Sequence, residues 1–278
     1  KWISEPSNPL TARVMVNRIW HHLFGRGLVR TVDNFGNNGE EPSHPQLLDY
    51  LADQFKKDWS IKKLIRRIVL SRSYQLAATY REENYEIDPA NALVWRHTLR
   101  RLDGEAIRDA MLSASGRLNL TPPKKSPVTE VGYGEVGRGI NMVPLQRENL
   151  HRSAYLPVLR GVIPEMLKVF DFAEPSLVVG RRSITTVPAQ ALYLMNSPFV
   201  LKNAESLALE LLKLKDASTR IETAYQRCLT RKPSNEEIQR VTAFIERSQT
   251  RLKENKEKLA WTSFCQAILA SAEFRYLN

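Results

Sequence analysis

Apolar residues recur every three or four positions along most of this chain, which is the pattern of amphipathic α-helices. The first such segment covers residues 9–24, and its apolar stripe is formed by Val16, Ile19 and Leu23. Asn8 can cap the start of this segment, and Gly25 is a residue type that commonly stops a helix. The pattern therefore predicts a helix from Pro9 to about Gly25.

The same periodicity continues through most of the remaining sequence and predicts a series of further helices. They cover residues 43–55, 61–74, 104–118, 165–172, 188–196, 198–215, 216–229, 234–256 and 259–274. Ser43 opens a capping-box pattern, and Ser60 is placed to cap a helix whose outer side is basic. Its outer residues are Lys62, Lys63, Arg66 and Arg67. A short helical turn is expected from Asp88 to about Trp95.

The helical pattern breaks in the middle of the chain. Residues 121–150 are rich in proline and glycine, which predicts a long irregular insertion. We expect one short strand over residues 154–162 and an extended segment over 183–187. The expected fold is mainly α, a multi-helix domain with at most one or two short strands. Its parts are an N-terminal helical part (1–120), an irregular central segment (121–186) and a C-terminal helical part (187–278), joined in one composite domain.

The formal charge of +11 is spread along the chain. The three parts carry net charges of +4, +3 and +4, and arginine outnumbers lysine by 26 to 15. Arginine is suited to paired ions and to two-pronged contacts with anions. An even spread of arginine therefore indicates ion pairs or anion sites more than a polybasic tail, and it makes nucleic-acid binding a weaker hypothesis.

Cysteine and histidine spacing gives no metal or redox motif. Cys228 and Cys265 are far apart, and no CxxC or CxxCH occurs, which argues against a zinc ribbon, thioredoxin chemistry or covalently attached haem. The two cysteines are either buried free thiols or one disulfide. The five histidines also lack a metal-binding spacing. No cofactor is expected on this segment.

Two short motifs match known catalytic or binding strings but lack their context. Gly132, Gly134 and Gly137 fit G-x-G-x-x-G, yet a loop precedes them where a nucleotide site needs a strand. Ser60 and Lys63 fit S-x-x-K, although a helix cap and a solvated lysine explain them as well. We favour the structural interpretation of both strings.

One polar cluster is expected on the first helix. Arg13, Asn17 and His21 follow each other at four-residue intervals, which places them along one flank. Such a flank either lines a polar cleft or forms a buried hydrogen-bond network against a neighbouring helix. Both interpretations stay open at this point.

Two further clusters combine charges in the central part. Glu105 and Asp109 lie one helical turn apart, either for acid–base chemistry or within an ion-pair lattice. Arg181 and Arg182 precede a helix that carries Gln190, which indicates either an anion site or a buried arginine beside a capped helix.

Several longer motifs occur along the chain and are informative as a set. They are Asn8-Pro-Leu-Thr-Ala-Arg-Val-Met-Val-Asn-Arg-Ile-Trp, Asp33-Asn-Phe-Gly, Pro42-Ser-His-Pro, Arg100-Arg-Leu-Asp-Gly-Glu-Ala-Ile-Arg-Asp, Phe170-Asp, the stretch 185–196, Thr230-Arg-Lys-Pro-Ser and Ser271-Ala-Glu-Phe. Together these motifs resemble planctomycete-specific domain one, a family of unknown function. The resemblance covers essentially the whole chain. It implies no established activity and no catalytic residues.

The resemblance also implies a setting. Members are C-terminal parts of large exported bacterial proteins, so a periplasmic or cell-surface location is expected. The first residue is Lys rather than Met, which fits an excised segment. Expected partners are other domains of the same parent chain, among them a c-type cytochrome domain that would carry haem. No apolar run here is long enough to cross a membrane.

Three functions follow from these observations. The first is an accessory module that binds a ligand or partner, with acidic or sulfated polysaccharide as the ligand. The second is an enzyme whose site combines the polar and arginine clusters described above. The third is nucleic-acid binding, which the basic composition suggests and the spread of charge disfavours.

Overall fold

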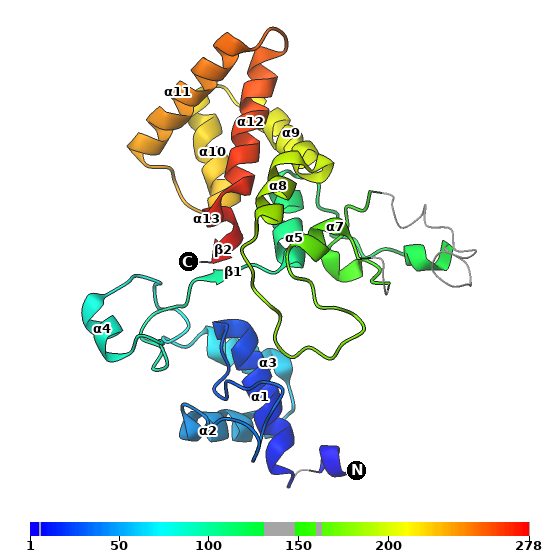
Figure 1. Ribbon diagram of the computed structural model, residues 1–278, viewed down its shortest axis with the longest axis vertical. Coiled ribbons are helices and arrows are strands. Elements are labelled where there is room, and N and C mark those ends of the chain that lie inside the picture. The colour runs from blue at the N-terminus through cyan, green and yellow to red at the C-terminus, as the bar shows by residue number, and fades with distance from the viewer. Residues whose placement is uncertain (6, 131–147, 160–162, 278) are drawn as a thin grey trace. The chain divides into compact units, whose positions relative to one another are not determined.

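The computed structural model describes residues 1–5, 7–130, 148–159 and 163–277 (Figure 1). The described chain is mainly helical, which confirms the expected fold class, and β1 (Arg100–Arg101) pairs with β2 (Tyr276–Leu277) in a two-stranded sheet. The chain divides into two compact units. Unit 1 holds Lys1–Arg100 and Val179–Arg181, and unit 2 holds Arg101–Val178 and Arg182–Leu277.

Unit 1 is built on three packed helices. Its elements are η1 (Trp2–Ser4), α1 (Pro9–Phe24), α2 (Pro45–Lys56), α3 (Ile61–Val69) and α4 (Glu82–Ile87). The first helix begins as the sequence predicts, because the Asn8 carboxamide oxygen accepts the backbone N–H groups of Leu10 at 2.8 Å and Thr11 at 3.2 Å. It ends at Gly25, whose φ of 79° is left-handed.

The core of unit 1 lies where α1, α2 and α3 meet. It is formed by Ala12, Val16, Ile19, Trp20, Phe24, Leu28, Val29, Leu48, Leu51, Ala52, Phe55, Leu64 and Ile68. On α3, Leu64 and Ile68 face this core, and every charged residue of the helix lies on the exposed side. The apolar stripe of α3 therefore orients its basic face outward, as the sequence indicates.

Several predicted helices end earlier than their periodicity suggests. Those predicted to run to Phe172, to about Lys215 and to Lys256 end at Val169, Leu212 and Arg251, and the one predicted over 259–274 begins at Lys256 and is interrupted at Ser271. The prediction that the third helix runs to Tyr74 is wrong, because the Ser71 hydroxyl donates to the Ile68 carbonyl at 2.6 Å and the chain turns there. The helix predicted to run to Leu118 is α5 (Gly104–Ala114), and it stops before Gly116, whose φ is 72°.

Two predicted helix starts also differ. Ser43 does not cap α2, since His44 holds that position and the Ser43 hydroxyl contacts the His44 ring nitrogen at 3.0 Å. The helical turn expected from Asp88 is a loop, because the Asp88 carboxylate accepts the backbone N–H groups of Ala92 and Leu93. The helix of this region is α4, which ends just before Asp88.

The strand expected at residues 154–162 is absent from the part of that stretch that the structure describes. A short 3-10 helix, η3 (Ser153–Tyr155), begins there instead. It is fixed by the backbone N–H and hydroxyl of Ser153, which donate to Asp109 on α5. Side-chain hydrogen bonds therefore set the local conformation in place of strand pairing.

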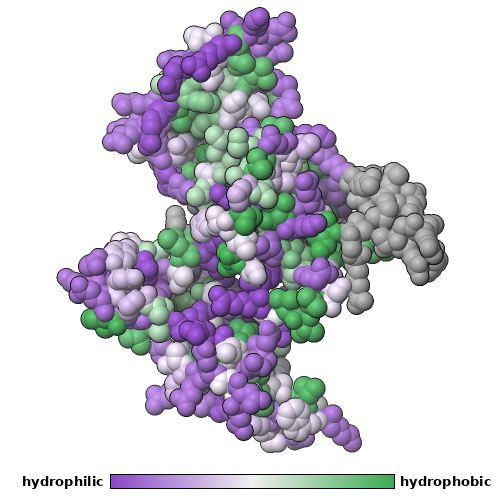
Figure 2. Space-filling model, viewed as in Figure 1, coloured by the Kyte–Doolittle hydropathy of each residue, from purple (hydrophilic) through white to green (hydrophobic). Residues whose placement is uncertain are grey.

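Unit 2 contains the remaining helices of the described residues, around a larger core. They are α5, η2 (Pro127–Glu130), η3, α7 (Glu165–Val169), α8 (Pro188–Asn196), α9 (Pro198–Leu212), α10 (Ala217–Leu229), α11 (Asn235–Arg251), α12 (Lys256–Ala270) and α13 (Ala272–Arg275). Helices α9 and α12 lie side by side at its centre, and α11 runs antiparallel to α12 (Figure 1). The outward side of α11 is hydrophilic in Figure 2, as expected for a helix with Val241 and Ile245 buried.

One arginine ties three elements of unit 2 together. Arg231 follows α10, whose last turn ends at Thr230 in the left-handed conformation. Its guanidinium donates two hydrogen bonds to Glu237 on α11, at 2.8 and 2.7 Å, and two to Glu273 on α13. Glu237 also completes a capping box with Ser234. We call Arg231, Glu237 and Glu273 the arginine clamp.

Both cysteines are buried free thiols in the core of unit 2. Burial raises the pKa of Cys228 to about 12, and burial together with the nearby Cys228 raises the pKa of Cys265. Because the thiolate is the nucleophile, we expect iodoacetamide to leave both cysteines unmodified at pH 8 in the folded protein. Mass spectrometry after timed labelling measures this, with denatured protein as the control. Rapid labelling of native protein would contradict the burial of these thiols.

The arginine clamp predicts a loss of stability in acid. Hydrogen bonding to Arg231 lowers the pKa of Glu237 to about 2 from its ordinary 4.5. A folded-state pKa below the unfolded one stabilises the fold above the unfolded value, and this contribution is lost as pH falls from about 4.5 through about 2. Urea unfolding across this range should show a decline that Glu237→Gln flattens. Glu236→Gln, an exposed neighbour, should keep the wild-type decline.

Candidate functional site

The predicted flank of α1 is committed to contacts within unit 1. The Arg13 guanidinium donates to Asp49 on α2 at 2.6 Å, which lowers the pKa of that carboxyl group. Asn17 is buried and exchanges two hydrogen bonds with the backbone of Val29, at 2.8 and 3.0 Å. His21 lies in the last turn, where its ring is 5.4 Å from that of His22. Arg13 therefore links α1 to α2, and Asn17 links α1 to the loop that follows it.

The two carboxylates of α5, Glu105 and Asp109, bind different partners. Glu105 makes a two-pronged ion pair with Arg182, at 2.7 and 2.9 Å, and the Arg182 guanidinium lies 4.9 Å from the centre of the Phe172 ring. Asp109 accepts hydrogen bonds from the backbone N–H and the hydroxyl of Ser153, at 2.8 and 2.6 Å. This pairing supports a structural role for both carboxylates.

A buried polar network lies beside the Glu105–Arg182 pair. Asp171 accepts the Arg101 guanidinium at 2.6 Å and both the backbone N–H and the hydroxyl of Thr185, at 2.9 and 2.8 Å. Gln190 on α8 donates to the carbonyls of Val169 and Thr185, both at 3.1 Å. Burial raises the pKa of Asp171, but the hydrogen bonds outweigh it and lower the pKa overall. We call Arg101, Asp171, Thr185 and Gln190 the Asp171 network.

The paired arginines of the sequence belong to different units. Arg181 is exposed in unit 1, whereas Arg182 is half-buried in unit 2. The structure thus joins Glu105 with Arg182 and places Gln190 in the adjacent network. The glycines Gly132, Gly134 and Gly137 lie outside the described residues. Ser60 acts as a helix cap, accepting the N–H of Lys63 at 3.3 Å, while the Lys63 ammonium pairs with Asp58 at 2.8 Å.

Several cationic side chains without such partners lie on the exposed face of α3. Lys62, Arg66 and Arg67 are exposed, and among the described residues none of the three makes a side-chain hydrogen bond or ion pair. Residues four apart on a helix lie on the same side, so Lys62 and Arg66 point in similar directions. We call Lys62, Lys63, Arg66 and Arg67 the basic face of α3. The sequence shows this cluster, but only the structure shows that its charge stays largely unpaired.

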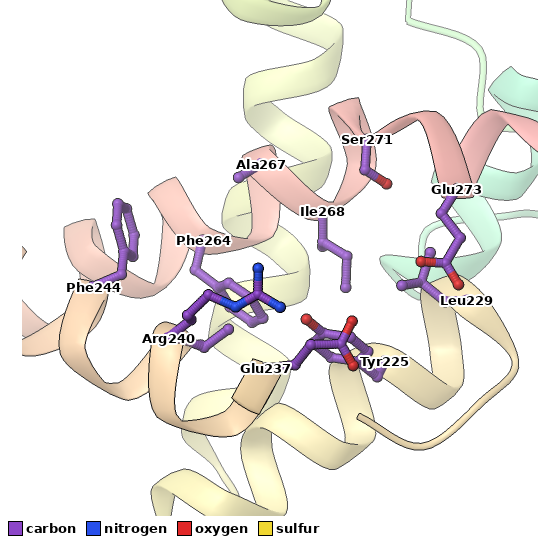
Figure 3. A pocket seen from close by; sticks show the side chains of 11 residues that line it. Tyr225, Leu229, Glu237, Arg240, Phe244, Phe264, Ala267, Ile268, Ser271 and Glu273 are labelled. Carbon is purple, nitrogen blue, oxygen red and sulfur yellow. The ribbon is translucent and has the colours of Figure 1, made fainter. Parts of the chain in front are cut away.

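Sequence reasoning missed a pocket between α10, α11 and α12 (Figure 3). It has a volume of about 310 Å³. Apolar side chains form most of its wall, including Leu229, Val241, Phe244, Phe264 and Ile268, and the two carboxylates of the arginine clamp, Glu237 and Glu273, also line it. The motifs around Arg231 and Glu273 were noted in the sequence, and the structure shows that they meet here. The apolar residues of the wall follow the same periodicity as core residues, so the sequence alone does not distinguish them.

Two kinds of feature are absent from the described residues. Helices with the length and apolar character needed to span a membrane are absent from the described part of the chain. Within the same residues, histidine, cysteine, aspartate and glutamate side chains do not gather in threes to form a metal site.

The Asp171 network predicts a large asymmetry between two charge-removing variants. The side chains of Arg101 and Asp171 are only 3% and 15% exposed. Asp171→Asn keeps the shape and tolerates the left-handed φ of 61°, yet leaves a buried guanidinium without its counter-charge. We expect a loss of about 3 kcal/mol in the free energy of unfolding. Asp49→Asn, which breaks the exposed pair with Arg13, should cost about 1 kcal/mol or less. Equal losses in urea titrations would refute this ranking.

Comparison with known proteins identifies a family. A family model described as a protein of unknown function (DUF1553) matches residues 1–245. The matched region includes α1 with its Asn8 cap, the Asp171 network and two members of the arginine clamp, Arg231 and Glu237. Searches of curated proteins and of solved structures found no match. The chain belongs to the PSD1 family of proteins of unknown function (DUF1553).

Proposed function

We propose that this chain is an accessory binding module that holds an acidic polysaccharide on the basic face of α3. The observation that carries the proposal is the unpaired charge there. Every charged side chain of the nine-residue helix is a cation. Among the described residues, the one carboxylate bonded to the basic face is Asp58, which pairs with Lys63 and also interacts electrostatically with Arg67. The other arginine clusters predicted from the sequence are largely occupied by internal carboxylates.

The geometry of the basic face suits a linear anionic chain. Lys62 and Arg66 are separated by one helical turn, about 6 Å along the axis, and so are Lys63 and Arg67. Arginine binds sulfate and carboxylate groups through two parallel hydrogen bonds. Leu70 caps the C-terminal end of the helix, about one turn after Arg66 and Arg67, and its exposed side chain offers an apolar contact for the body of a sugar ring.

A polysaccharide is favoured over nucleic acid by two considerations. The basic face spans a single helix of nine residues, roughly 13 Å long, which offers few phosphate contacts. The expected periplasmic or cell-surface location, which stays a prediction, also puts polysaccharide within reach. A haem-bearing cytochrome domain elsewhere in the parent chain stays a prediction as well, and it is compatible with a binding role for this segment.

Titration with matched polymers tests the proposal. We expect binding to dextran sulfate and to polygalacturonate, weakening as salt is raised, and no binding to neutral dextran. A triple variant, Lys62→Gln, Arg66→Gln and Arg67→Gln, should lower the affinity for both acidic polymers about tenfold, because three exposed charge contacts are removed. Isothermal titration calorimetry measures each affinity.

A second triple variant serves as the control. Lys124→Gln, Lys125→Gln and Lys253→Gln remove the same charge from exposed lysines elsewhere and should leave binding unchanged. Equal losses in both triple variants would show that net charge alone drives association. Tighter binding to duplex DNA than to either acidic polysaccharide at physiological salt would overturn the proposal in favour of nucleic acid.

A further inference from the structure

The pocket of unit 2 has a wall that matches an apolar ligand. Its side chains come from α10, α11, α12 and the start of α13, so it is complete within one compact unit. Phe264 and Ile268 are buried at its base, while Phe244 at its rim is 37% exposed. A volume of about 310 Å³ is near the lower end for sites that bind small molecules.

The carboxylates at one end of the pocket are already committed. Glu237 and Glu273 each receive two hydrogen bonds from the guanidinium of Arg231. Glu237 is ionised at neutral pH, and hydrogen bonding to Arg231 lowers its pKa further, to about 2. Since Arg231 engages both oxygens of each carboxylate, this end of the pocket offers a ligand little free acceptor capacity. A cationic ligand would have to compete with Arg231 for these groups.

Two hydrogen-bond donors in the pocket lack such partners. Arg240 extends from α11 toward α12 across the pocket (Figure 3), and among the described residues it makes no hydrogen bond or ion pair. The hydroxyl of Tyr225 likewise makes no hydrogen bond within the described part of the chain. Burial, and then the charge of Glu237, raise the pKa of Tyr225, so this hydroxyl stays a donor at neutral pH.

The apolar wall and the two unpaired donors indicate a ligand with an apolar body and a head group that accepts hydrogen bonds. We propose that this pocket binds a small amphipathic acid, with its aromatic or branched apolar body against Phe244, Phe264 and Ile268 and its carboxylate on Arg240. Guanidinium and carboxylate form a two-pronged, charge-assisted pair. The Tyr225 hydroxyl supplies a further donor to the same head group. The charge of Arg240 discriminates against an amine, and an amide of the same shape loses the charge assistance.

A set of ligands with one body and different heads tests the assignment. Phenylacetate, phenylacetamide and phenethylamine share the aromatic body, and acetate supplies the head alone. In NMR titrations of the full chain we expect phenylacetate to bind about tenfold more tightly than the amide and the amine. Acetate should show no saturable binding, because it buries little apolar surface.

Variants separate the contributions of head and body. Arg240→Gln should weaken phenylacetate binding about tenfold and leave phenylacetamide unchanged, since only the charged head contacts Arg240. Phe244→Ala should weaken both ligands by a similar factor. Arg247→Gln is the matched control, because Arg247 lies on the same helix outside the pocket lining and donates to the carbonyl of Ala243. It should change neither affinity, and all three variants are exposed positions that should keep the wild-type melting temperature.

Three results would overturn the assignment. They are equal affinity for acid, amide and amine, unchanged phenylacetate binding in Arg240→Gln, and no saturable phenylacetate binding at millimolar concentration. Binding of a peptide that ends in phenylalanine, without binding of phenylacetate, would replace the small acid with a protein partner. None of these results depends on the basic face of α3, so this inference and the proposed polysaccharide site can fail separately.

Discussion

Asp171 joins the two ends of the long connection between α7 and α8, because it follows α7 and accepts hydrogen bonds from Thr185 just before α8. Residues 172–187 have no helix or strand, so their backbone groups need partners from side chains or water. Asp171 accepts hydrogen bonds from Arg101 and from both donors of Thr185, and Gln190 donates to the carbonyls of Val169 and Thr185. This single arrangement fixes the start of α5, the end of α7 and the start of α8. The charge of Asp171 is stabilised by three hydrogen bonds, from Arg101 and from the backbone N–H and hydroxyl of Thr185.

Although the chain has a net charge of +11, many of its arginine side chains are paired with acceptors inside the fold. Guanidinium groups satisfy carboxylates and carbonyls in the Asp171 network, in the Glu105–Arg182 pair and in the arginine clamp. Cations with no such partner are found on the exposed side of α3 and at Arg240 in the pocket. The arginines that are paired inside the fold therefore differ from the unpaired ones in their surroundings. The unpaired ones are the groups we expect to bind anions.

The sequence predicted the helices well where periodicity and caps agree, as in α1 with Asn8 and Gly25. It failed where a short polar side chain competes for the backbone, as at Ser71 and Asp88, because such hydrogen bonds do not alter apolar periodicity. The candidate clusters were visible as residue types. Several arginines meet carboxylates that are far away in the sequence, such as Arg182 with Glu105, 77 residues apart, and local patterns do not encode such contacts.

The short sheet of β1 and β2 has a mechanical consequence. The N–H of Leu102 donates to the carbonyl of Arg275 at 2.7 Å, so the chain enters and leaves the helical part of unit 2 at neighbouring points. Tension carried along the backbone between Arg101 and Tyr276 would act first across this small set of hydrogen bonds. The helices between Arg101 and Tyr276 would be stretched only after those hydrogen bonds had broken. The two-stranded sheet would therefore protect these helices from small forces.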